Sequence, residues 1–296
     1  MQLIENVTVL GDRHFRIYAV GKGPAVLLEG GVSAVVPAVL KQAAAGLVPP
    51  GVSHLVVMHA HYDHVCGIPG LREIFPGALV AGSAEARKIL QRAKIVTHFF
   101  KEDAATTEAL RQETGLEEKA FDSVVDHINV ERVIEDGEKW TLGPGSTLHF
   151  YRAPGHSPCS LLAYLPESEV LFSSDCAGFP VNDKCIFPIF FEGYAKYLTT
   201  IDRMRDFRAE ILAGAHEQLI FGRKYVAEFL DQARSETERM KEFVSSGRKK
   251  GLGEQEIADL LFDMYYCDNL RIYSVNNIRF CCSLLVRRVL ETEENG

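Results

Sequence analysis

The 296-residue sequence has little of what membrane-spanning and exported proteins need. It contains no continuous apolar run of the roughly 20 residues that a membrane-spanning helix requires. The first residues, Met1 to Asn6, lack the basic region and the apolar core of a secretory signal. We therefore expect a cytoplasmic protein that has no membrane partner.

Positive charge is also in short supply. The chain has 32 Lys and Arg residues against 40 Asp and Glu residues, which gives a net charge of −8. Proteins that bind nucleic acids neutralise phosphates with clustered Lys and Arg side chains. We therefore expect no nucleic-acid partner, and the expected ligand is a small-molecule substrate.

Cysteine is present seven times, but the number is odd and no Cys-x-x-Cys spacing occurs. This argues against a disulfide framework and against a zinc site built from cysteine pairs. Free thiols are typical of a reducing compartment, and buried cysteines commonly behave as small hydrophobic residues. The chemistry of this chain must therefore be sought in other side chains.

What the sequence does have is a dense cluster of side chains that bind metals. The string His59-Ala-His-Tyr-Asp-His64 directly follows the apolar run 54–58, which predicts a short buried strand. His59 and His61 can point the same way because extended chain repeats every two residues. Asp63 and His64 follow at a predicted helix start. Mixed imidazole and carboxylate ligands are typical of catalytic rather than closed structural metal sites.

Three further candidate ligands lie downstream, which argues against a chance cluster of surface histidines. His156, Asp175 and His216 each follow a short hydrophobic run, at 147–151, 169–172 and 211–213. These runs predict strands, and loops at strand ends are where binding and catalytic groups concentrate. Four strand ends that deliver seven nitrogen or oxygen ligands are enough for two metal ions.

This pattern resembles the metallo-β-lactamase superfamily. The resemblance rests on the His59-x-His61-x-Asp63-His64 string followed in order by His156, Asp175 and His216, and it covers about residues 1–222. It implies an α/β fold, a four-layer αββα sandwich with the metals at one edge of two sheets. A small C-terminal helical extension would follow.

The resemblance also implies a ligand set. One ion would be held by His59, His61 and His156, and the second by Asp63, His64 and His216. Asp175 would bridge the two ions together with a water or hydroxide. Glu29, in the string Leu-Leu-Glu-Gly-Gly, stands where the family more often has Asp, and it would fix the orientation of a ligand imidazole.

The implied activity is that of a binuclear metal-dependent hydrolase. Two divalent ions, expected to be zinc with iron or manganese as alternatives, lower the pKa of a bridging water from about 15.7 toward neutrality. The resulting hydroxide would attack a small ester, thioester, lactone or phosphoester, and Asp63 would orient it or carry a proton. The sequence does not choose among these substrates.

A second, narrower resemblance points to a different activity. The segments 153–156, 163–167 and 171–175 are similar to the diiron domain of flavodiiron proteins. The alternative function is therefore a non-haem diiron protein that binds or reduces dioxygen. Against it, that family normally has Glu where this chain has His61, and the chain has no room for a flavodoxin domain.

The remaining sequence predicts the domain organisation. Strands are expected at 7–10, 15–18, 25–28 and 78–80, and helices at 35–45, 68–75 and 84–93. Residues 94–127 predict a helical insertion without core periodicity, either a solvated excursion or a lid over the site. His98 and His127 at its ends are expected to be ordinary polar residues.

From Phe221 onward the pattern is helical only, which predicts a domain at 1–222 and a helical subdomain at 223–296. The tail has too many apolar positions for free helices to expose. We expect these positions to be covered by the sandwich, by one another or by a second copy. The favoured arrangement is a tail that closes the substrate cleft and contributes to a homodimer. The apolar positions include Phe229, Leu260, Leu261, Phe280 and Leu284.

Overall fold

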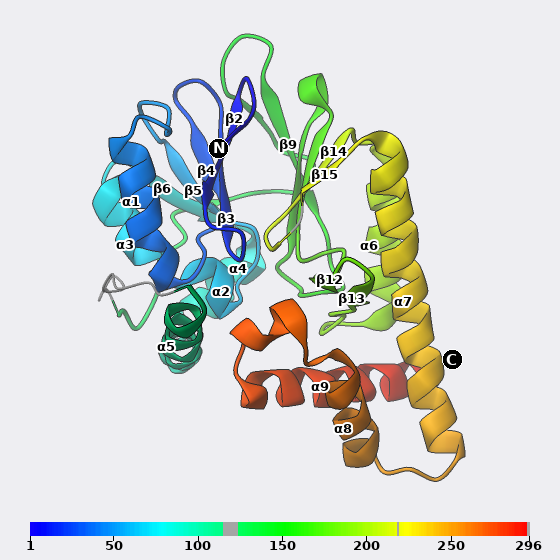
Figure 1. Ribbon diagram of the computed structural model, residues 1–296. Coiled ribbons are helices and arrows are strands. Elements are labelled where there is room, and N and C mark those ends of the chain that lie inside the picture. Colours follow the sequence, from blue (N-terminus) through cyan, green and yellow to red (C-terminus); the bar gives the residue numbers. More distant parts are fainter. Residues whose placement is uncertain (115–123, 218, 295–296) are drawn as a thin grey trace.

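Two β-sheets lie face to face in the computed structural model, which describes residues 1–114, 124–217 and 219–294. Helices cover the outer faces of both sheets, and three C-terminal helices extend past one end of the sandwich (Figure 1). This is the α/β sandwich with a C-terminal helical part that the sequence predicts.

The first sheet holds seven strands in chain order. Its first four strands pair in antiparallel fashion, and β4 to β7 then run parallel to one another. The parallel strands place their carboxyl ends at one edge of the sheet. The strands are β1 (Gln2–Ile4), β2 (Val7–Gly11), β3 (Arg16–Val20), β4 (Val26–Leu28), β5 (His54–Val57), β6 (Leu79–Gly82) and β7 (Arg132–Val133).

The second sheet holds six strands in the order β15-β14-β11-β10-β9-β8, and a separate hairpin pairs β12 with β13. Strands β11 and β14 are parallel, and β9 runs in the same direction because β10 is antiparallel to both β9 and β11. The strands are β8 (Lys139–Thr141), β9 (Thr147–Arg152), β10 (Leu161–Leu165), β11 (Val170–Ser174), β12 (Phe179–Asn182), β13 (Cys185–Phe187), β14 (Ile211–Gly214) and β15 (Leu219–Phe221).

Most helices cover the outer faces of the two sheets, and α8 and α9 lie at one end of the sandwich (Figure 1). They are α1 (Val36–Ala44), α2 (Tyr62–Val65), α3 (Ile68–Ile74), α4 (Ala84–Leu90), α5 (Ala93–Thr114), α6 (Tyr194–Asp206), α7 (Arg223–Lys249), α8 (Glu254–Tyr265) and α9 (Val275–Glu294). The described residues also form three short 3₁₀ segments: η1 (Ser33–Val35) before α1, η2 (Pro166–Ser168) between β10 and β11, and η3 (Asp268–Ile272) between α8 and α9.

Strand β5 shows how the sequence builds the layers. Val56 and Met58 belong to the core between the two sheets, whereas Leu55 and Val57 pack under the outer helices. Both sets are buried because successive side chains of a strand point to opposite faces. A strand that is covered on both sides is continuously apolar, which is why the run before His59 is easy to recognise.

The predicted insertion at 94–127 differs from its expectation. Helix α5 has a buried face, because Val96, Phe100 and Leu110 belong to the main core. The prediction that this segment lacks core periodicity was therefore wrong. Part of this face is polar: Asp103 is buried and accepts hydrogen bonds from the backbone N–H and the hydroxyl of Ser33. A buried carboxylate hides the helical periodicity from a hydropathy pattern. Residues 115–123 of the predicted insertion lie outside the described residues.

We expect Asp103→Ala to lower the free energy of unfolding by about 1–3 kcal/mol, because it leaves the buried donors of Ser33 without their acceptor. Chemical denaturation measures this change. Asp103→Asn is the matched control, since an amide oxygen still accepts from the Ser33 backbone N–H. Equal losses in both variants would mean that the hydrogen bonds do not stabilise the contact.

The predicted division at residue 222 coincides with the start of α7, but the core continues across it. Val226 and Leu230 of α7 pack in the same buried cluster as Ile201 and Leu212. Two separate domains therefore stay a prediction, as does the homodimer. Within the described residues, no helix combines the length and the hydropathy needed to cross a membrane.

The expected covering of the tail holds only in part. Leu261 is fully buried and Leu284 is partly covered, but Leu260 is 45% exposed and Phe280 is 65% exposed. Within the single chain these two side chains are not covered, so their covering by a second copy stays a prediction. Helical spacing does not distinguish an exposed apolar position from a buried one at the border of a helix face.

Candidate metal centre

All seven candidate ligands lie at the edge where strands of both sheets end. His59 follows β5, and Glu29 follows the parallel neighbour β4 directly. In the other sheet, His156, Asp175 and His216 follow β9, β11 and β14, which share one direction. Parallel strands bring their carboxyl ends to a common edge, so residues far apart in sequence meet there.

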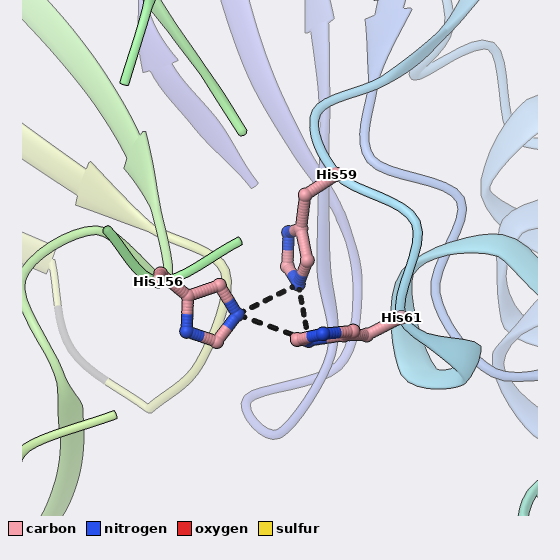
Figure 2. A group of neighbouring side chains, drawn as sticks. All are labelled: His59, His61 and His156. Atoms are coloured by element: carbon pink, nitrogen blue, oxygen red, sulfur yellow. Dashed lines mark hydrogen bonds between the residues drawn. The ribbon is translucent and has the colours of Figure 1, made fainter. Parts of the chain in front are cut away.

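Three histidines form the first group of donor atoms. Figure 2 shows His59 and His61, from the segment between β5 and α2, and His156, from the loop after β9, pointing toward one another. Their facing nitrogens lie 3.0 to 3.2 Å apart: His61 Nδ1 is 3.1 Å from His59 Nε2 and 3.0 Å from His156 Nε2, and the two Nε2 atoms are 3.2 Å apart. Three nitrogens that share a tetrahedral zinc ion at about 2.0–2.1 Å are separated by roughly 3.3 Å. The spacing therefore fits one ion.

The second group combines carboxylates with imidazoles. His64 Nε2 and His216 Nε2 are 3.3 Å apart, and Asp63 Oδ2 is 3.6 Å from the first and 3.7 Å from the second. The donor atoms of this group lie within 4.8 Å of one another, as do those of the three-histidine group. The two groups together use six of the seven candidate residues.

Asp175 lies between the groups. Its Oδ2 atom is 3.7 Å from His59 Nε2, and its Oδ1 atom is 3.2 Å from His216 Nε2. The same Oδ2 is 3.5 Å from His156 Nε2 and 3.3 Å from His64 Nε2. One carboxylate therefore reaches histidines of both groups, which is the position of a bridging ligand.

Oxygen atoms behind the imidazoles fix which nitrogen faces the centre. The Nδ1 atom of His156 lies 2.7 Å from the carbonyl oxygen of Ile189, and that of His64 lies 2.8 Å from Glu29 Oε2. An Nδ1–H that donates to these oxygens leaves Nε2 free to bind a metal. His216 is held in the same way by the carbonyl oxygen of His14, at 2.7 Å. His61 is different, because it turns Nδ1 toward the centre.

The surroundings of His59, His61 and His156 favour the neutral form of all three imidazoles. Burial lowers the pKa of His59 and His156, and for His59 the neighbouring imidazoles lower it further. Burial and the charge of His156 lower the pKa of His61 to about 3. Neutral imidazole is the form that binds metals. Neutral imidazoles whose nitrogens converge can offer lone pairs to one cation, so these residues fit a metal ion.

Carboxylates dominate the second group. Burial lowers the pKa of His64, but Asp175, Asp63 and Glu29 outweigh it and raise the pKa well above its usual value. The pKa of His216 is raised mainly by Asp175 against the effect of burial. Burial raises the pKa of Asp175, but His64 and His216 lower it by more than burial raises it. The net pKa lies well below its usual value, so the carboxyl stays ionised. The carboxylates that favour positive charge on these two imidazoles would also favour a cation between them.

Three residues beside the ligands have left-handed backbone angles that glycine usually adopts. Glu29, Ser174 and Glu217 have φ values of 74°, 49° and 52°. Each turns the chain at a strand end: Glu29 reaches His64, Ser174 precedes Asp175, and Glu217 follows His216. Strained backbone of this kind tends to cluster at functional sites.

Sequence reasoning missed Tyr273, which the C-terminal part of the chain brings to the centre. Its hydroxyl donates a hydrogen bond to Asp63 Oδ2 at 2.8 Å, and its ring packs edge-on against Phe15 and Phe179. Burial and the charge of Asp63 raise the pKa of Tyr273, so it keeps its proton. No sequence signal links Tyr273 to Asp63, because 210 residues separate them.

The centre opens into a cavity of about 310 Å³. Its wall includes His61, Asp63, His156 and Asp175, so a ligand in the cavity touches both groups of donors. His98 also lines the cavity without joining either group, and His127 lies on the surface, where it pairs with Asp126. The structure thus brings every candidate ligand together, while their role as metal ligands stays a prediction.

Comparisons with known proteins agree with this geometry. Residues 15–216 match the family model described as "Metallo-beta-lactamase superfamily". Among curated proteins, a linear primary-alkylsulfatase from Pseudomonas sp. (strain ATCC 19151) is 25% identical over 117 residues, 39% of this chain. The match spans only 22% of the length of the sulfatase.

Solved structures extend the similarity beyond the matched family region. A metallo-beta-lactamase family protein from Thermus thermophilus is similar with a TM-score of 0.69 at 18% identity, over 99% of this chain and 95% of the other. The rubredoxin oxygen:oxidoreductase from Desulfovibrio gigas, a flavodiiron protein, is similar with a TM-score of 0.55 at 15% identity, over 85% of this chain and 70% of the other. Identities this low establish the fold alone.

Proposed function

This chain belongs to the metallo-beta-lactamase superfamily, and we propose on that basis that it is a binuclear metal-dependent hydrolase of a small ester, thioester, lactone or phosphoester. The observation that carries the proposal is the position of Asp175 between two complete groups of donor atoms. Zinc is the proposed metal, with iron and manganese as alternatives.

In the proposed site, each ion has its own set of ligands. The nitrogens of His59, His61 and His156 would hold one ion, and Asp63, His64 and His216 would hold the other, with Asp175 shared. When bound, the two ions would lower the pKa of a water molecule toward neutrality and polarise the oxygen of the substrate.

The side chains of the protein supply the remaining parts of a hydrolytic site. The Asp63 carboxylate faces the cavity and is held by Tyr273, so it can orient a water molecule or carry a proton to the leaving group. Glu29 accepts from His64 and keeps its Nε2 atom directed inward. Because these groups are already positioned, little reorganisation is needed when a substrate enters.

Metal content tests the binuclear assignment. We expect fully loaded protein to contain close to two first-row metal ions per chain, because seven ligands exceed what one ion needs. Elemental analysis after loading and desalting is the measurement. A reproducible plateau at one ion would contradict the binuclear site, and no bound metal would contradict the whole proposal.

A substrate panel tests the activity. Zinc- or manganese-loaded protein should hydrolyse at least one ester, thioester, lactone or phosphoester, and the alkylsulfatase similarity adds a sulfate ester to the panel.

The alternative function is a diiron protein that reacts with dioxygen. The sequence segments of the second resemblance support it, whereas His61 argues against it because that family normally has Glu at this position. Rapid oxygen consumption and a changed visible spectrum of the iron form, without hydrolysis, would favour that alternative.

Glu29 offers a test that does not depend on the substrate. We expect Glu29→Ala to weaken binding of one metal ion by about 10- to 100-fold, because the carboxylate that orients His64 is lost. Competitive metal titration measures the two affinities. Glu29→Gln keeps an oxygen that can accept from Nδ1 and should lose less. Unchanged metal affinities in the alanine variant would show that Glu29 does not orient His64 for metal binding.

A further inference from the structure

The cavity beside the metal centre is mostly apolar away from the ligands. Three parts of the chain form this wall: α5, the segment from β12 to Phe191, and the η3–α9 segment of the C-terminal part. In Figure 1, α5 and α9 lie at the same end of the sandwich. The apolar lining side chains are Phe99, Phe179, Phe187, Ile189, Phe191, Leu270, Ile278, Phe280 and Leu284.

The acidic and basic side chains that line the cavity are unevenly represented, because carboxylates are present and Lys and Arg are not among the described lining residues. Besides the two ligand carboxylates, the cavity is lined by Glu102, and none of the described lining residues is Lys or Arg. An anionic group placed away from the metals would therefore find no cation and would face Glu102. Because burying an unpaired charge is costly, a phosphorylated or otherwise polyanionic substrate body does not suit this wall.

Aromatic rings continue the apolar surface up to the donor atoms. The ring of Phe191 lies 5.4 Å from the ring of His156, and the ring of Phe179 lies 5.2 Å from that of His216. An apolar group next to the reacting bond would therefore contact these two rings. The cavity volume of about 310 Å³ is near the lower end of the roughly 300–1,000 Å³ found for ligand pockets, which limits this group to a small one.

We propose that the substrate is a small carboxylic ester, thioester or lactone with an uncharged, apolar body, whose body occupies the wall formed by α5, residues 179–191 and α9. This rests on the proposed hydrolytic function and names its substrate class. In the reaction, the oxygen of water bonds to the acyl carbon and the carbon–oxygen or carbon–sulfur bond breaks. The alcohol or thiol takes one proton of the water, and the acid keeps the added oxygen and the other proton. In a lactone the freed hydroxyl stays on the same molecule as the acid.

A series of linear acyl thioesters tests the apolar wall. With metal-loaded protein, kcat/KM should rise by about fourfold per added methylene over chains of about two to ten carbons, until the cavity is full. Matched thioesters that end in a carboxylate should react more slowly than their methyl-ended counterparts. Equal or faster reaction of the charged series would overturn the proposal.

Variants on two different helices of the wall locate the acyl chain. Leu284→Trp on α9 narrows the cavity and should move the preferred chain length to shorter chains. Phe99→Ala on α5 widens it and should move the preference to longer chains. Leu260→Trp, at an exposed position of α8 that does not line the cavity, is the control and should leave the profile unchanged. A preference that neither cavity variant moves would overturn the proposal.

A binding measurement separates this proposal from the hydrolytic one. The affinity of linear monocarboxylates, measured by calorimetry on metal-loaded protein, should rise with chain length and respond to the same variants. Length-dependent binding without turnover of any ester would support the apolar site while contradicting the hydrolase. Turnover with no preference for chain length would contradict the apolar site and leave the hydrolase standing. Absence of both would contradict both.

Discussion

Asp175→Ala should disturb both metal ions at once and lower turnover on the order of 10²–10³-fold or more. The reason is its position, since its two carboxylate oxygens lie 3.2 to 3.7 Å from imidazole nitrogens of both donor groups. Two divalent ions separated by about 3.5–4 Å repel each other strongly, and a shared carboxylate offsets that repulsion. Without it, each ion loses a ligand and the pair loses a negative charge.

Metal titration of purified variants measures this effect. His216→Ala is the matched comparison, because His216 belongs to one donor group only and its loss should mainly weaken the second ion. Asp259→Ala removes a carboxylate that pairs with Arg279 on the surface, and it should change neither metal content nor turnover. Indistinguishable losses in Asp175→Ala and His216→Ala would leave the bridging role without support.

The parts of the centre that were predictable from the sequence follow from strand geometry. An apolar run covered on both faces, such as 54–58, ends where the chain leaves the sheet, and the next polar residues lie at the sheet edge. That reasoning located His59, His156 and His216 without any knowledge of which strands are neighbours. It works because the functional strands share a direction, so one rule applies to all of them.

What could not be predicted depends on contacts between distant parts of the chain. The Tyr273 hydroxyl reaches Asp63 only because η3 packs against α5 and β12, and no periodicity encodes that packing. The buried Asp103 made α5 look like a solvated helix. The helical spacing predicted that Phe280 is covered, but it could not tell that its side chain lines the cavity and is largely exposed in the single chain. In each case tertiary packing, rather than local pattern, decides the environment.

Asp63→Asn should lower kcat by about 10²- to 10⁴-fold while KM changes little, the range expected when a group that transfers or orients a proton is lost. The amide keeps the shape of the side chain and an oxygen that can accept from the Tyr273 hydroxyl. It loses the negative charge that lies 3.6 Å from His64 Nε2 and 3.7 Å from His216 Nε2. Steady-state kinetics at saturating metal is the measurement.

Excess metal and Tyr273 separate the two roles that Asp63 combines. If Asp63→Asn only binds the second ion poorly, added zinc should restore turnover. If Asp63 also transfers a proton, kcat stays low when both ions are bound.

Tyr273→Phe keeps the ring packing and removes only the hydroxyl, so metal content should stay at the wild-type level. Its kcat should fall by about 10- to 100-fold, the loss expected for one hydrogen bond to a charged group. Full turnover of Asp63→Asn with two ions bound would show that the proton is carried elsewhere, and the hydrogen bond from Tyr273 would then serve only to hold Asp63 as a ligand.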